Sequence, residues 1–204
     1  MSRVFKLQMV ALGLAVWISL IFYTADAQAQ LVIPSVGKGS IEVILFSDYF
    51  CPPCKRIDRQ AESLLKELLS TGGVKITFVD VPFRKETVFF NKYYLYAANA
   101  VPDAENILRV RRKLFEAAQE RRIRTEEALQ TYLKKENILL KPFDERTIRP
   151  LMIALNQEYK VDQTPICVIY YSAAKTKRLV GTDEIWTGLT MLQSELTKAK
   201  KRKP

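Results

Sequence analysis

Histidine is absent from the 204-residue sequence, and cysteine is scarce, with three residues at positions 51, 54 and 167. The absence of histidine excludes Ser–His–Asp and Cys–His catalytic arrangements, HExxH zinc sites and any imidazole general base. A structural zinc site takes four nitrogen or sulfur ligands, and one chain with three cysteines and no histidine cannot supply them. We therefore expect no metal. Internal repeats and long low-complexity segments are also lacking. From the length of the chain we expect a single domain that carries an insertion.

The first 29 residues have the pattern of an export signal. Arg3 and Lys6 precede an uncharged, mostly apolar run over residues 7–23, and alanines follow at alternate positions within residues 25–29. This order of charge, apolar run and small residues is typical of a cleaved signal peptide. The alternative is an uncleaved N-terminal anchor, because the apolar run reaches the lower length limit of a membrane span. We expect an exported protein, in a Gram-negative periplasm or anchored at a Gram-positive surface.

Positive charge exceeds negative charge, with a formal net charge of +10, and it is dense in the C-terminal segment, residues 198–204. Such a tail can contact anionic lipid or nucleic acid. No aromatic residue interleaves with these cations, and we predict a solvated end after the last helix and no nucleic-acid partner.

The remaining chain predicts an α/β protein. Residues 30–40 contain proline, glycines and serine and are predicted to be a linker. Residues 41–83 contain an apolar β-branched run at 41–46, an amphipathic helix after the first two cysteines, and an alternating strand at 74–81. Residues 84–160 have helical periodicity, and residues 161–197 contain two strands, 166–171 and 178–181, and a helix, 185–198. A thioredoxin-like core, 41–83 with 161–197, interrupted by a helical subdomain, 84–160, is the predicted architecture.

The segment Cys51-Pro52-Pro53-Cys54 lies where the first strand turns into the amphipathic helix. Cys51 is thus expected at the helix N-terminus, where unpaired N–H groups and the helix dipole favour a thiolate. Pro52 and Pro53 suit the first turn, where a missing N–H costs nothing. We predict Cys51 as the nucleophile and Cys54 as the thiol that resolves a mixed disulfide. A static disulfide is the alternative, although so short a loop gives little entropic stabilisation.

A second motif, Thr164-Pro165, opens the strand at 166–171. The run from Phe46 to Cys54, followed by residues 161–165, resembles the DsbA-like family of the thioredoxin superfamily, over about residues 40–196. The resemblance implies that Pro165 is a cis-proline packed against the dithiol. It implies that Thr164 binds an extended substrate through its backbone, and we place Pro52 and Pro53 in the same substrate-binding surface. No dissociable cofactor is implied, since the dithiol is its own redox centre.

The sequence departs from that family at two positions. Many members carry a buried glutamate six residues before the first cysteine, where this chain has Leu45; Asp48 is a possible substitute or an exposed structural residue. Strongly oxidising members have histidine inside the CxxC motif, where this chain has Pro53. Without that histidine the protein should be less oxidising than such members. Cys167, in an apolar strand, is expected to be a buried, inert thiol, with a regulatory or intermolecular thiol as the alternative.

The sequence therefore predicts an exported thiol–disulfide oxidoreductase that exchanges disulfides with cysteines of secreted proteins. The electrons exchanged by the dithiol must pass to or from a redox partner, which we expect to be a membrane protein. Two alternatives remain open: a disulfide reductase or isomerase kept reduced by a membrane partner, and a non-catalytic thioredoxin-like module that binds a soft metal ion or a protein.

Overall fold

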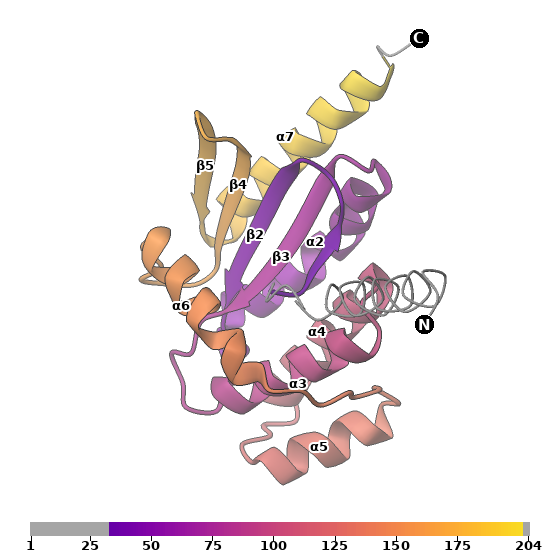
Figure 1. Ribbon diagram of the computed structural model, residues 1–204, viewed down its shortest axis with the longest axis vertical. Helices are drawn as coiled ribbons and strands as arrows, with labels where there is room; N and C mark the ends of the chain where they lie inside the picture. Colours follow the sequence, from indigo (N-terminus) through magenta and orange to yellow (C-terminus); the bar gives the residue numbers. More distant parts are fainter. Residues whose placement is uncertain (1–32, 202–204) are drawn as a thin grey trace, which may run out of the picture. The chain divides into compact units, whose positions relative to one another are not determined.

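The computed structural model describes residues 33–201 (Figure 1). The predicted export signal or anchor, residues 1–29, lies outside the described residues, as do the first residues of the predicted linker and residues 202–204 of the predicted basic tail. Within the described range no helix is long and apolar enough to cross a membrane.

The core is a five-stranded sheet with the strand order β1-β3-β2-β4-β5. Its strands are β1 (Ser35–Gly37), β2 (Ile41–Ser47), β3 (Val74–Asp80), β4 (Ile166–Ser172) and β5 (Lys175–Val180). The two central strands β2 and β3 are parallel, and the other pairs are antiparallel. The near-continuous burial of β2 and β3 matches their β-branched and aromatic sequences, which suit strands covered on both faces.

Strand β1 corrects the sequence prediction, which assigned residues 30–40 to a linker. Ser35 pairs with Thr77 and Gly37 with Lys75, so β1 extends the sheet antiparallel to β3. Ile33, just before the strand, is buried in an apolar cluster with Val79. The glycines and proline around this three-residue strand hid it from a periodicity argument, because so short a strand shows no alternation.

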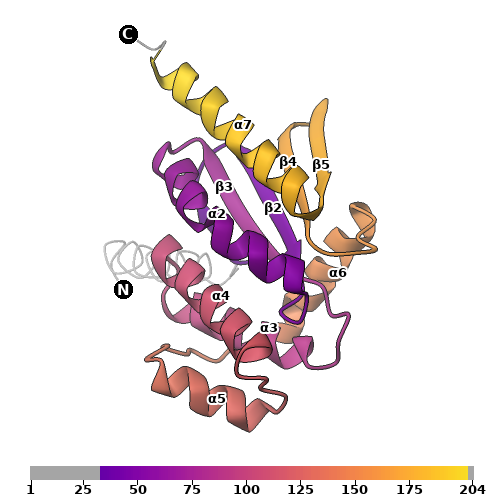
Figure 2. The same cartoon turned by 180° about the vertical axis from the view of Figure 1, so that it is seen from behind.

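Helices cover both faces of the sheet. Helices α2 (Pro52–Ser70) and α7 (Gly181–Lys201) lie side by side on one face, and α6 (Arg149–Glu158) covers the other (Figures 1 and 2). Helix α7 begins four residues before the predicted start at residue 185 and continues through Lys201. The helix therefore continues three residues beyond its predicted end at residue 198, and residues 198–200 are exposed, as expected for a solvated end.

The segment between β3 and β4 is helical, as predicted. It contains α3 (Thr87–Ala100), α4 (Ala104–Gln119), α5 (Glu126–Lys135), a short 3-10 helix (Glu145–Thr147) and α6. Asp103 and Thr125 cap α4 and α5, their side chains accepting backbone N–H groups that have no partner within the helix. Helix α4 packs on both α2 and α3 (Figure 2), which brings its C-terminal end to the start of α2.

Candidate active site

The first two cysteines form a disulfide at the N-terminus of α2. Their Cα atoms lie 5.2 Å apart, and the backbone N–H of Cys54 donates to the Sγ of Cys51 over 3.2 Å. Cys51 is half-buried and Cys54 is 1% exposed, so a molecule in solution can reach only the first sulfur.

Cys51 is the N-cap residue of α2, with extended backbone angles (φ −89°, ψ 111°). Pro52 and Pro53 occupy the first turn, where their fixed φ suits the helix and their missing N–H groups need no partner. No acidic side chain lies in that turn to oppose a thiolate. The helix dipole and the Cys54 N–H therefore both favour negative charge on Cys51 once the disulfide is reduced.

The Thr164–Pro165 peptide bond is cis, as the resemblance implied, and it lies against the dithiol. The Cys51 Sγ is 3.4 Å from the carbonyl oxygen of Thr164, a distance over which a reduced thiol can donate a hydrogen bond. Pro165 is buried and lines a small cavity together with Cys54. The structure thus brings together two motifs that are 110 residues apart in sequence, at Cys54 and Thr164.

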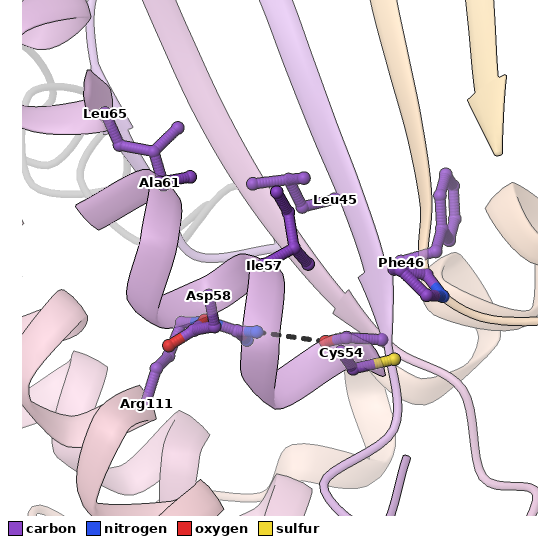
Figure 3. Close-up of a pocket in the computed structure, with 10 residues that line it drawn as sticks. Leu45, Phe46, Cys54, Ile57, Asp58, Ala61, Leu65 and Arg111 are labelled. Atoms are coloured by element: carbon purple, nitrogen blue, oxygen red, sulfur yellow. Dashed lines mark hydrogen bonds and ion pairs between the residues drawn. The ribbon is translucent and has the colours of Figure 1, made fainter. Parts of the chain in front are cut away.

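That cavity, of about 20 Å³, lies behind Cys54 between β2 and α2 (Figure 3). Leu45 and Ile57 contribute to its lining, which is almost wholly apolar. Its charged members, Asp58 and Arg111, are hydrogen-bonded to each other over 2.9 Å. Because Leu45 replaces the glutamate found in many family members, no carboxylate at that position can exchange a proton with Cys54.

Asp48 does not take over that position. Its carboxylate accepts the Phe50 backbone N–H over 2.7 Å and the Thr87 hydroxyl over 2.9 Å, and the residue is 2% exposed. Its backbone carbonyl accepts the N–H of Cys51. The predicted structural role is therefore the one observed, but the side chain is buried and not exposed as expected: Asp48 holds the turn that presents Cys51.

A buried charge cluster, which the sequence analysis did not identify, joins α4 to the core. Arg111 is 2% exposed; its Nε donates to Asp58, its Nη2 donates to Ser47, and its Nη1 lies 3.5 Å from Asp80. Its guanidinium also stacks 4.2 Å from the centre of the Phe78 ring. Burial raises the pKa of both carboxyls, against the opposing effect of Arg111. Burial also disfavours the charged guanidinium, yet the two carboxylates raise its pKa, so Arg111 stays a cation.

Gln119, the last residue of α4, holds the active-site turn from outside. Its Nε2 donates to the carbonyl oxygens of Tyr49 and Cys51, over 2.8 and 3.0 Å. One of these carbonyls belongs to Cys51, the candidate nucleophile, and the other lies two residues before it. The helical insertion therefore fixes the backbone at the dithiol. Nothing local in the sequence indicated this role, because the contact spans 68 residues.

Cys167 lies in β4 opposite Leu45 and is fully buried. Burial raises the pKa of its thiol well above the ordinary value, so it remains protonated in neutral solution. This agrees with the predicted inert thiol. Among residues 33–201, no three histidine, cysteine, aspartate or glutamate side chains are grouped so that they could hold a metal ion.

A dithiol at a helix N-terminus, with its second sulfur buried and a cis-proline against it, defines a thiol–disulfide oxidoreductase of the thioredoxin class. A family model described as thioredoxin matches residues 37–170, and the chain belongs to that family. A search of the curated proteins found no match.

Solved structures support the same fold. A periplasmic thioredoxin-like protein from Salmonella enterica serovar Typhimurium superposes with a TM-score of 0.60 at 21% identity, covering 85% of this chain and 94% of its own. A variant of alpha-DsbA1 from Wolbachia pipientis superposes with a TM-score of 0.60 at 14% identity, covering 81% of this chain and 93% of its own. Oxidised BdbD from Bacillus subtilis superposes with a TM-score of 0.53 at 22% identity, covering 79% of this chain and 92% of its own. The predicted thioredoxin-like fold with a helical insertion and the resemblance to DsbA-like proteins are confirmed.

Proposed function

We propose that the protein is an exported thiol–disulfide oxidoreductase that exchanges disulfides with cysteines of secreted proteins. The observation that carries the proposal is the asymmetry of the dithiol. Cys51 is reachable and stabilised as an anion at the N-terminus of α2, whereas Cys54 is buried directly behind it. One sulfur that meets substrate and one that does not are what a mixed-disulfide mechanism requires.

The exchange proceeds in two displacements. A substrate thiolate attacks the Cys51 sulfur, the Cys51–Cys54 bond breaks, and Cys54 leaves as a thiolate. A second substrate thiolate then attacks the substrate sulfur of the mixed disulfide and releases Cys51. The substrate has lost two electrons, and the reduced dithiol passes them to a redox partner, which we propose is a membrane protein. The reverse sequence reduces a substrate disulfide.

Thr164, Pro52 and Pro53 are proposed to contact the substrate. The Thr164 carbonyl is 3.4 Å from Cys51, so an extended chain bound along this backbone would place its cysteine beside the nucleophile. Pro52 is exposed and Pro53 half-buried on the other side of Cys51. Pro165 is proposed to keep an N–H group away from the dithiol, because proline has none to donate to either sulfur.

Export is proposed from the signal-like segment over residues 1–29, and it agrees with the periplasmic source of the Salmonella enterica structure. The periplasm is the proposed compartment, with the domain anchored to the membrane if the segment is not cleaved. Disulfide exchange with secreted proteins is possible in such an oxidising compartment.

Insulin reduction by the purified domain tests the activity, with Cys51→Ser as the inactive variant and Cys167→Ser as the matched control. We expect turnover that the first substitution abolishes and the second retains. Turnover that survives Cys51→Ser would refute the assignment of the nucleophile. Acid trapping and alkylation in intact cells measure the redox state of the dithiol and so the direction of electron flow.

A further inference from the structure

Two open hollows flank the dithiol and share Pro52 and Gln119 as a common rim. The first, of about 320 Å³, also contains Phe50, Arg84, Glu86 and Arg124. The second, of about 580 Å³, also contains Lys55, Arg56, Arg59 and Gln60. Because Pro52 follows Cys51 directly and Gln119 donates to the Cys51 carbonyl oxygen, a substrate chain that extends from the nucleophile across Pro52 lies over these hollows.

Both hollows are strongly basic. Five cationic side chains line the two hollows, and the only carboxylate among the lining residues is that of Glu86. A second carboxylate, Glu120, pairs with Lys55 and Arg59 through the same oxygen, 2.6 Å from each. Two carboxylates against five cations leave a positive excess beside Cys51, where the attacking or leaving sulfur of a substrate has to lie.

Three of these cations have no ion pair within residues 33–201. Arg56, on α2, and Arg84, between β3 and α3, are exposed, and within residues 33–201 neither has a carboxylate oxygen within 4.0 Å. They lie in different hollows, one on each side of Pro52. A third, Arg124, stacks 4.6 Å from the centre of the Phe50 ring, and its Nη1 donates to two backbone carbonyls, so its charge is fixed in place.

We infer that the preferred substrate is a polypeptide with aspartate or glutamate residues on both sides of its reactive cysteine. This deepens the proposed function and rests on it. Acidic side chains in the two hollows would pair with Arg56 and Arg84, and the positive field would steer such a chain to the dithiol. Steering of this kind accelerates association and weakens steeply with salt. Phe50, under Arg124, provides an apolar contact next to the cysteine.

The test compares two disulfide-bonded peptides that differ only in the residues beside the cysteines, glutamate in one and glutamine in the other. The fully reduced protein attacks each peptide disulfide, Cys54 resolves the mixed disulfide, and the initial rate is read by acid quenching and alkylation. We expect the acidic peptide to react about tenfold faster at low salt, and the difference to fall below about twofold at about 500 mM NaCl, where the Debye length is only ~4 Å.

The double variant Arg56→Gln, Arg84→Gln removes one unpaired cation from each hollow and should reduce the preference to about threefold or less. Its matched control, Arg146→Gln with Lys198→Gln, lowers the net charge equally at exposed residues outside both hollows. The control should keep the preference. Equal rates for the two peptides in the unaltered protein would overturn the inference, as would an equal effect of the two double variants.

Insulin separates the possible failures. If insulin is reduced but the peptides react equally, the preference is wrong and the oxidoreductase assignment stands. If neither insulin nor either peptide is reduced, the proposed function falls, and this inference with it. Binding to phosphatidylglycerol vesicles that Arg56→Gln, Arg84→Gln abolishes, together with equal peptide rates, would assign the hollows to an anionic lipid surface and overturn the inference.

Discussion

Arg111→Met tests the view that the buried charge cluster fastens the helical insertion to the core. Methionine retains much of the length of arginine and its contact with Phe78, but it leaves Asp58 and Asp80 buried without a cation. The two side chains are 10% and 1% exposed, so water cannot replace the guanidinium. Breaking a buried charge pair from one side costs about 3–5 kcal/mol. For a domain of this size that corresponds to a fall in Tm of roughly 6–20 °C.

The neighbouring Arg112 supplies a matched control on the same helix. It pairs with Glu62 over 2.7 Å, but its side chain is 39% exposed. Solvent screens this pair, and Arg112→Met should cost no more than about 1 kcal/mol. Guanidinium chloride unfolding of both variants, with the disulfide kept oxidised, measures the two losses of unfolding free energy.

The pH dependence provides a second readout of the same cluster. Burial already raises the pKa of Asp58 and Asp80, and removing Arg111 raises it further. Their folded pKa values then lie above the unfolded value of about 3.9. Protonation on acidification therefore favours the folded variant, and its deficit relative to the unaltered protein should shrink from pH 8 to pH 5. A loss below about 1 kcal/mol, or a deficit independent of pH, would refute the reasoning.

Three further predictions concern the dithiol and the third cysteine. Gln119→Leu leaves the carbonyls of Tyr49 and Cys51 without the side-chain donor of Gln119. Insulin reduction should slow several-fold, with a stability loss of about 1–3 kcal/mol. An unchanged rate would show that the active-site turn keeps its conformation without Gln119. Pro53→His should make the protein more oxidising by about 30 mV for each unit by which the pKa of Cys51 falls, measured by equilibration with glutathione, and a shift in the other direction would contradict it. Native Cys167 should resist iodoacetamide at pH 8.5 and react only after unfolding, because burial raises the pKa of its thiol. Since the unfolded thiol ionises near about pH 8.5, this thiol's contribution to stability should be complete below that pH and decline above it; rapid labelling of the folded protein would reveal an accessible thiol.

The sequence predicted the parts of the site that depend on local order. Cys51 follows a buried strand and precedes an apolar helical stripe, and these two patterns alone place it at a helix N-terminus. The cis-proline came from resemblance, because no periodicity argument distinguishes it from an ordinary turn. Strand β1 escaped prediction since its three residues pair with β3 only through tertiary contact.

The contacts made by the helical insertion were beyond local reasoning. Gln119 meets the active-site turn only because α4 packs on α2, a relation that depends on the relative placement of whole helices. Arg111 did leave a signal, because it interrupts the apolar stripe formed by Ile107, Val110 and Leu114. A cation on the core face of a helix indicates a buried counter-ion, although the sequence does not say which of many carboxylates supplies it.

The direction of β1 has a practical consequence for handling the domain. Because Ser35 pairs with Thr77 and the strand then runs toward Lys75, the chain enters the sheet beside the carboxyl end of β3, the end at which the dithiol lies. Helix α7 starts at that end, with Gly181 bonded to Pro165, and runs toward the opposite end (Figure 1). A surface linker or fluorescent fusion attached before Ile33 would therefore join the sheet at the same end as Cys51. The same attachment after α7 would lie toward the opposite end, so immobilised forms for activity assays are best tethered through the C-terminal helix.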